Sequence, residues 1–172
     1  PRVSRPPVRP APDAPLSKRH FRTQDLGRPG GCSIEAQIPL LTNKDVTLTM
    51  VRPDAADPVY FVNGDADALY FIFRGSGVLR TPLGDIRFEQ DDYVAVPKGV
   101  LHRFIPDEGV EQDWLLMEGQ GLGLLEQWRN DAGQLSMDAP YCHRDFRRPD
   151  FQGPMDEGIR ELVVQRDGAC HG

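Results

Sequence analysis

The sequence predicts an all-β protein, either a sandwich or a small barrel, and two features of residues 60–104 support this class. Short runs rich in Tyr, Phe, Ile and Val recur along this stretch, and such runs are typical of β-strands. Glycine, proline and aspartate stand between the runs, where they form turns. The expected strands are residues 69–73, 78–81, 86–89, 93–97 and 100–104.

The turn residues of this stretch have a more particular spacing. A Gly-Ser-Gly turn at residues 75–77 follows one strand, and Pro97, Gly99 and His102 come two strands later. This layout resembles that of the cupins, whose fold is a double-stranded β-helix, or jelly-roll barrel. The resemblance implies a fold, whereas function has to be argued from the residues of a site.

Residues 68–73 are apolar on both faces of the expected strand. Because successive side chains of a strand point to opposite sides, parity divides them into two sets. These sets are Ala68, Tyr70 and Ile72 on one face, and Leu69, Phe71 and Phe73 on the other. We expect Tyr70 and Ile72 to face the barrel core, together with Val94 and Val96. The other face should be covered by a second sheet, a second domain or another subunit, and oligomerisation is the preferred explanation.

A further strand is expected at residues 46–51, which precede the stretch 60–104. Apolar and polar side chains alternate along it, with Val46, Leu48 and Met50 on one face and Thr47 and Thr49 on the other. This alternation is typical of a half-buried strand.

The chain divides into three parts by composition. Residues 1–19 form a proline-rich, basic arm, residues 20–151 a cupin-like barrel, and residues 152–172 a C-terminal extension. The arm favours extended polyproline II structure and has too few large apolar side chains for a core of its own, so its own barrel or a neighbouring chain must hold it. The extension ends in a strand and an Asp-Gly turn, which normally leads to another strand. We therefore expect the extension to be the start of a missing second half.

The composition also limits the classes of partner. A net charge of −6 and the lack of a basic cluster among the expected strands argue against nucleic acid. No apolar run approaches the ~18 residues that a membrane span needs. The three cysteines, Cys32, Cys142 and Cys170, are odd in number and widely spaced, which favours a reduced, cytoplasmic protein.

The metal-ligand positions of the cupin layout are mostly filled by residues that do not bind metal. Metal-binding cupins place a His-x-His pair and a Glu in the first motif and one more His in the second. Here Phe61, Asn63 and Ala68 stand at the first three positions, and only His102 remains. One imidazole does not hold a divalent metal, because such sites need about three or more protein ligands. We therefore predict no metal for this chain alone.

Four residues remain as candidates for a pocket: Asn63, Asp65, Tyr70 and His102. Asp65 could offer an oxygen together with Asp67, although Asx residues beside glycine form turns first. His102 is either a pocket residue or a half-exposed imidazole at a strand end. A role for His102 as a general base assisted by Tyr70 has less support. No catalytic residue is assigned from the sequence.

The adjacent residues Cys142 and His143 invite a metal interpretation. Neighbours on a strand point to opposite faces, so the pair by itself is weak support for a metal site. We instead expect a loop held by pairs among Arg144, Asp145 and Arg147.

Several segments of the chain match one known family in order and spacing. They are residues 60–104, Trp-Arg-Asn-Asp at 128–131, Pro-Tyr-Cys-His-Arg-Asp-Phe-Arg at 140–147, and Glu-Leu-Val-Val-Gln-Arg-Asp-Gly at 161–168. These segments resemble the N-terminal half of the homogentisate 1,2-dioxygenase family, from about His20 to Gly168. The resemblance implies a double-cupin enzyme of tyrosine and phenylalanine breakdown that cleaves the ring of a small aromatic acid with Fe(II) and molecular oxygen. It also implies that the iron ligands, two His and one Glu, lie in the C-terminal half, while the N-terminal barrel serves packing, assembly and closure of the active site.

Two hypotheses follow for the function. The chain is the N-terminal part of a homogentisate-type dioxygenase, with the missing C-terminal half or further copies in a homo-oligomer as its partners. Alternatively, it is a stand-alone metal-free cupin that binds a small molecule or assembles other proteins. The mass of the intact polypeptide, compared with the 19.3 kDa of this chain, discriminates between them.

Overall fold

The computed structural model describes residues 3–8, 20, 22–122, 126–151, 153 and 156–172, and most of their regular structure is β-strand. The strands are β1 (Gln37–Thr42), β2 (Val46–Val51), β3 (Tyr60–Asn63), β4 (Asp67–Arg74), β5 (Gly77–Thr81), β6 (Gly84–Phe88), β7 (Tyr93–Val96), β8 (Arg103–Pro106), β9 (Asp113–Gly119), β10 (Leu162–Arg166) and β11 (Ala169–His171). Short 3-10 helices also occur, namely η1 (Thr23–Asp25), η2 (Glu126–Trp128) and η3 (His143–Asp145). The predicted all-β class is confirmed.

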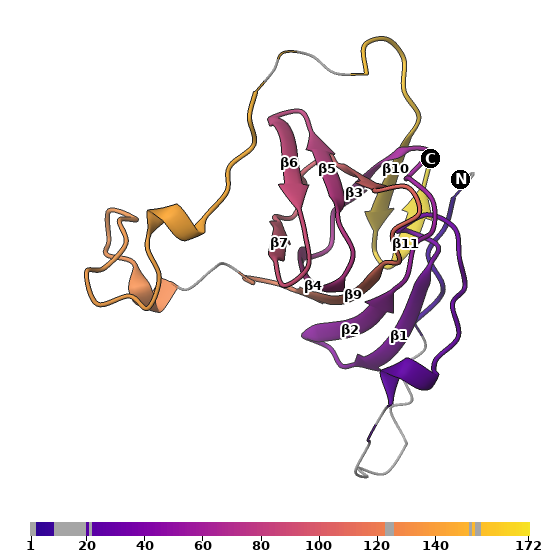
Figure 1. The fold of residues 1–172 in the computed structure, drawn as a ribbon, viewed down its shortest axis with the longest axis horizontal. Coiled ribbons are helices and arrows are strands. Elements are labelled where there is room, and N and C mark those ends of the chain that lie inside the picture. Colours follow the sequence, from indigo (N-terminus) through magenta and orange to yellow (C-terminus); the bar gives the residue numbers. More distant parts are fainter. Residues whose placement is uncertain (1–2, 9–19, 21, 123–125, 152, 154–155) are drawn as a thin grey trace.

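The strands form two layers around a common core (Figure 1). One sheet has the order β1-β2-β9-β4-β7. The other is assembled from β6-β5-β8 and β11-β10-β3, which meet where Phe61 of β3 and His102, just before β8, form an antiparallel bridge. When β1, β10 and β11 are left out, the strand order is β2-β9-β4-β7 in one sheet and β3-β8-β5-β6 in the other. This is the double Greek-key arrangement of a jelly roll.

The core lies between the two sheets and is centred on Trp114 of β9, which is fully buried. Its ring lies 5.4 Å from that of Phe88 on β6 and 5.0 Å from that of Phe104 at β8. Aromatic pairs at these distances attract one another beyond the area they bury. One aromatic cluster therefore joins the two layers.

The strand parity expected for β4 and β7 is confirmed on the inner face. The inward side chains are buried, with exposed fractions of 5% for Tyr70, 0% for Ile72, 6% for Val94 and 4% for Val96. On the outer face the ring of Phe71 contacts the rings of Phe73 and Tyr93, each at a centroid distance of 4.8 Å. The described residues of the chain leave Phe73 47% and Tyr93 62% exposed, so the expected cover by a second sheet of this chain is not found there. Cover by another subunit or domain stays a prediction.

The alternation along β2 has its polar face turned inward. Thr49 pairs with Leu116 of β9, and Val51 pairs with Trp114. Because cross-strand partners share a face, Thr49 points into the barrel together with Leu116. From hydrophobicity alone, Val46, Leu48 and Met50 would be expected to face the core instead. Both faces are in fact covered at this end of the strand, since Thr49 and Met50 are both buried.

The start of the arm lies against the chain's own barrel. Val3 is 4% exposed and belongs to a second hydrophobic cluster, outside the main core. Its other members are Cys32, Ile34, Val59, Phe61 and Val163, with Cys170 packed at the edge. Of the two supports considered for the arm, residues 3–8 therefore use their own barrel. Residues 9–19 lie outside the described part of the chain.

The C-terminal extension adds two strands to the barrel. β10 pairs in parallel with β3, and β11 pairs antiparallel with β10 after the Asp167-Gly168 turn. The strand expected beyond this turn is therefore present in the chain itself. Asp156 fastens the extension further, because its carboxylate accepts hydrogen bonds from Tyr60, Arg80 and Arg103 at 3.0–3.3 Å.

Residues 126–151 leave the barrel after β9 and return to its β6 edge (Figure 1). The return contact is close, since a Cβ atom on Gly84 would lie 2.3 Å from the backbone oxygen of Asp150. Gly84 also has a φ of +124°, which only glycine adopts without strain.

No helix in the described part of the chain is long and apolar enough to span a membrane.

Candidate functional site around Glu118

The inner face of β9 ends in a carboxylate. Its inward side chains are Trp114, Leu116 and Glu118, all buried. In the sheet register, Glu118 lies between Thr47 of β2 and Ala68 of β4. A buried carboxylate needs compensation, because transfer of an unpaired charge out of water is costly. The neighbours of Glu118 therefore define the first candidate site.

Asn63, at the end of β3, holds one oxygen of this carboxylate. Its Nδ2 donates to Glu118 Oε1 at 2.7 Å. Its Oδ1 accepts from the backbone N–H groups of Asp65 and Ala66 at 2.9 and 3.0 Å, which is an Asx turn. The turn fixes the amide orientation, so Asn63 presents its donor to Glu118.

The positive charge opposite Glu118 comes from the arm. Nη1 and Nη2 of Arg5 donate to the two carboxylate oxygens at 2.7 and 2.5 Å, a bidentate pair. Nε of Arg5 donates to Gln37 Oε1 at 2.9 Å, and Nη1 also contacts Gln165 Oε1. Burial alone would lower the pKa of Arg5, but the hydrogen bond and charge of Glu118 outweigh burial and raise the pKa.

The structure brings only part of the predicted pocket set to this place. Asn63 belongs to it directly. Asp65 instead accepts from the backbone N–H groups of Asp167 and Gly168, at 2.8 and 3.0 Å, and so supports the β10–β11 turn. Burial opposes the ionised form of Asp65, yet these hydrogen bonds lower its pKa overall. Asp65 therefore lies in a turn, but its carboxylate bonds the backbone of the β10–β11 turn and not its own backbone.

Tyr70 and His102 are buried on the core side of the site. Burial and the nearby charge of Glu118 raise the pKa of Tyr70 well above its ordinary value. His102 is 2% exposed, so the half-exposed alternative is wrong. Its Nδ1 lies 2.9 Å from the backbone oxygen of Val100, which can only accept, so Nδ1 carries the proton. Burial lowers the pKa of His102, which favours the neutral imidazole.

A general-base pair of His102 and Tyr70 has no support in the geometry. Each ring contacts Phe104, at centroid distances of 5.8 and 4.8 Å. Among the hydrogen bonds of the described residues, none joins the two side chains. Their contacts are those of packed core residues.

The donor set does not fit the Fe(II) that the family resemblance implies. His102, the remaining ligand position, packs against Phe61 at a centroid distance of 5.7 Å. Glu118 is already paired with the Arg5 guanidinium, and the amide of Asn63 turns its donor toward that carboxylate. Within the described ranges, no three His, Cys, Asp or Glu side chains are grouped closely enough to share a metal ion.

Sequence reasoning missed four members of the site: Arg5, Gln37, Glu118 and Gln165. Glu118 had a usable signal, because it continues the inward parity of Trp114 and Leu116. The two glutamines had none, since nothing local distinguishes an inward glutamine on a strand. For Arg5 the only signal was the basic composition of the arm.

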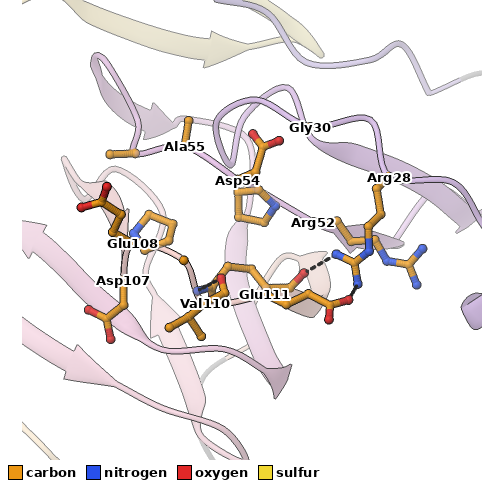
Figure 2. Close-up of a pocket in the computed structure, with 14 residues that line it drawn as sticks. Arg28, Gly30, Arg52, Asp54, Ala55, Asp107, Glu108, Val110 and Glu111 are labelled. Carbon is orange, nitrogen blue, oxygen red and sulfur yellow. Dashed lines mark hydrogen bonds and ion pairs between the residues drawn. The ribbon is translucent and has the colours of Figure 1, made fainter.

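Away from the Glu118 site, a cavity of about 520 Å³ lies among the loops that join β2 to β3 and β8 to β9 (Figure 2). Arg28 lines one side of it and pairs with Glu111, and its Nη1 donates to the backbone oxygen of Gln112 at 3.1 Å. The buried Arg52 donates to Asp113 and to the backbone oxygens of Thr23, Leu26 and Gly27. These contacts hold the chain before β1 against the barrel, which is a structural role.

The Cys142–His143 pair lies in the excursion beyond the barrel. Cys142 precedes η3, and its backbone N–H donates to Asp145 at 2.7 Å. Arg147 pairs with Asp92 and Glu89 at the β7 edge rather than with Asp145. The expected pairs among Arg144, Asp145 and Arg147 are therefore not found in the described part of the chain, and Arg147 instead ties the loop to acidic residues of the barrel.

Comparison with known proteins gives one curated relative. No family model matches the chain. A candidate dioxygenase of Saccharolobus solfataricus is 24% identical over 130 residues, which cover 75% of this chain and 33% of that protein. The chain therefore spans about a third of the length of this relative.

Solved structures of similar shape include cupins and an enzyme. The polyketide cyclase RemF from Streptomyces resistomycificus has a TM-score of 0.49 and 19% identity over 60% of this chain and 80% of its own. A cupin-2 domain protein from Shewanella frigidimarina has a TM-score of 0.43 and 18% identity over 49% of this chain and 79% of its own. The assignment of the fold rests on the strand order. The fold is a cupin-type jelly roll.

Proposed function

We propose that this chain is the N-terminal, metal-free barrel of a larger ring-cleaving dioxygenase of the homogentisate 1,2-dioxygenase type. The observation that carries the proposal is the filling of the barrel interior by the Arg5–Glu118 pair, beside the positions where a metal-binding cupin places its donors. An interior filled in this way suits a barrel that supports assembly. The Fe(II), its ligands and the small aromatic acid would then lie outside this chain, in the longer polypeptide that the relative's length suggests.

The outer face of the five-stranded sheet is the surface that we assign to the remaining protein. Phe71, Phe73 and Tyr93 form an aromatic cluster there, and Phe73 and Tyr93 are about half exposed or more. Leu69, Leu115 and Met117 extend the apolar surface with half-buried side chains. An apolar sheet face of this kind usually marks an interface. Its partner is the C-terminal half or a further copy of the same chain.

The test compares the 172-residue chain with the full-length gene product. Iron content is measured by mass spectrometry, and oxygen uptake is followed with 2,5-dihydroxyphenylacetate and with benzoate as a non-substrate control. We expect iron and uptake in the full-length protein and neither in the short chain. His102→Ala in the full-length protein should keep its iron, because His102 is assigned no ligand role. One equivalent of iron on the short chain, lost on His102→Ala, would overturn the proposal.

The second candidate is a metal-free binding module, and a cavity beside Arg5 favours it. This cavity has a volume of about 510 Å³ and is lined by residues 4–8, Thr47, Glu118 and residues 168–170. That volume is in the range of small-molecule sites. If the full-length product has neither iron nor oxygen uptake while the short chain binds a small molecule here, this candidate replaces the first.

A further inference from the structure

The guanidinium of Arg5 donates hydrogen bonds to groups from three strands. Glu118 of β9 accepts from both terminal nitrogens, Gln37 of β1 accepts from Nε, and Gln165 of β10 accepts from Nη1. The side chains of Arg5 and Glu118 are only 12% and 9% exposed. The two terminal nitrogens of the planar guanidinium face the two oxygens of the carboxylate, and a lysine ammonium does not reproduce this geometry.

The acceptors are oriented by contacts that do not involve Arg5. Gln37 donates through Nε2 to the backbone oxygen of Ser33 at 3.0 Å, which leaves its Oε1 for the guanidinium. Gln165 donates through Nε2 to Asp65 at 3.3 Å, which again leaves Oε1 free to accept. Asn63 donates to Glu118 and thereby holds the carboxylate in place. The barrel thus presents a prearranged set of acceptors to a cation with several donors.

The charge of the site points to the same kind of ligand. Within the described ranges, Arg5 is the cation that hydrogen-bonds Glu118. Without it, a buried carboxylate would face two glutamine oxygens and no positive charge, which is an unfavourable arrangement. Without Arg5 the site would therefore attract another cation. Because its acceptor oxygens lie in three directions, it favours a planar cation with several donors.

In the described residues 3–8, the arm contacts the barrel through the buried Val3 and through Arg5. Residues 4–8 form no helix or strand, and Pro7 and Val8 are exposed. Val3 is the buried anchor, in the cluster around Phe61 and Val163. The arm itself forms one wall of the 510 Å³ cavity that leads to the site. Departure of residues 4–8 would therefore open the acceptors to solvent.

We propose that the Glu118 site is a guanidinium-binding site, which Arg5 fills from within the chain and which accepts an external guanidinium compound when Arg5 is absent. The ligand class is an alkylguanidinium, such as an arginine side chain. This proposal goes beyond the dioxygenase assignment and does not depend on it, because it concerns the barrel alone.

The test is chemical rescue of Arg5→Ala in the 172-residue chain. We expect the variant to unfold at a lower temperature than the parent chain, and ethylguanidinium chloride at 1–20 mM to raise its midpoint with saturation. Sodium chloride and ethylammonium chloride at equal concentrations should raise it less. The parent chain should show no rise, since its site is filled. Arg22→Ala serves as the matched control, because this arginine is exposed and should show neither loss nor rescue.

Two further measurements keep the proposal falsifiable. Arg5→Ala combined with Glu118→Gln should lose the response to ethylguanidinium. If Arg5→Ala does not fold, nuclear magnetic resonance of the parent chain decides, where the Nε–H of Arg5 should give a slowly exchanging signal that is absent in Arg5→Lys. Equal rescue by sodium chloride, rescue that survives Glu118→Gln, or rapid exchange of that Nε–H would overturn the proposal.

Discussion

Replacing Asp57 with asparagine is expected to remove a pH dependence from the stability of the barrel. Asp57 is 1% exposed and lies in the loop before β3. Its carboxylate accepts from the backbone N–H and hydroxyl of Ser33 at 2.8 and 2.9 Å, and from the backbone N–H of Phe104 at 2.7 Å. Burial raises the pKa of Asp57 to about 6, although these hydrogen bonds and the charge of Arg103 favour the ionised form.

The sign follows from proton linkage. The folded chain binds the Asp57 proton more tightly than the unfolded chain, whose carboxyl has the ordinary value of 3.8. The stability gained from protonation is therefore fully present below pH 4 and is lost as the pH rises through about 6. A difference of about two pKa units corresponds to about 3 kcal/mol in total, of which about 2 kcal/mol falls between pH 4.5 and 7.5.

The assay is urea unfolding of the parent chain and Asp57→Asn at pH 4.5, 5.5, 6.5 and 7.5. The asparagine variant will be less stable at each pH, because its amide cannot accept from all three donors. The difference in free energy of unfolding between the parent chain and Asp57→Asn should shrink by about 2 kcal/mol from pH 4.5 to 7.5, because only the parent chain loses the contribution of the Asp57 proton. Asp107→Asn is the control of opposite sign, because hydrogen bonds from Arg87 and Ser76 lower the pKa of Asp107. A flat or growing difference for Asp57→Asn would refute the reasoning.

The remaining predictions concern the two faces of β4. Ile72→Ala should lower the free energy of unfolding by about 2–4 kcal/mol, because Ile72 is fully buried, whereas Val110→Ala at an exposed loop should change it little. Both are measured by urea unfolding, and a loss below about 1 kcal/mol for Ile72→Ala would contradict the assigned core. Phe73→Ser should weaken self-association or association with the C-terminal half in sedimentation velocity, while Leu83→Ser, also exposed, should not. Unchanged association of Phe73→Ser would remove this face from the proposed interface.

Strand existence and parity were predictable because the side-chain period of a strand is two. Tyr70 and Ile72 are inward and Phe71 and Phe73 outward, as alternation requires. The same rule could not choose the inward face of β2. There Thr49 faces the core, and Met50 on the opposite face is buried as well. A strand covered on both faces offers no hydrophobic contrast from which to choose.

The residues at the cupin ligand positions could be identified from the sequence, but the group that pairs with Glu118 could not. Counting positions from the turn motif identified Phe61, Asn63 and Ala68 at the ligand places, and of these Asn63 contacts Glu118 in the structure. The partner of Glu118 could not be found in this way, because Arg5 is 113 residues away in sequence. No local pattern encodes a contact over such a separation.

The Arg5–Glu118 pair explains why a proline-rich arm is useful to a barrel of this kind. Glu118 follows the inward parity of β9, so the strand that builds the core also buries a carboxylate. A buried carboxylate must be paired or protonated. A metal ion could supply the charge only with further ligands, which Phe61 and Ala68 do not provide. A guanidinium needs only oxygen acceptors, and Gln37 and Gln165 provide them. The prolines limit the conformations of the arm before docking, and this lowers the entropy lost when Arg5 binds. Because the cation is attached to the chain, occupancy of the barrel interior is coupled to the position of the arm.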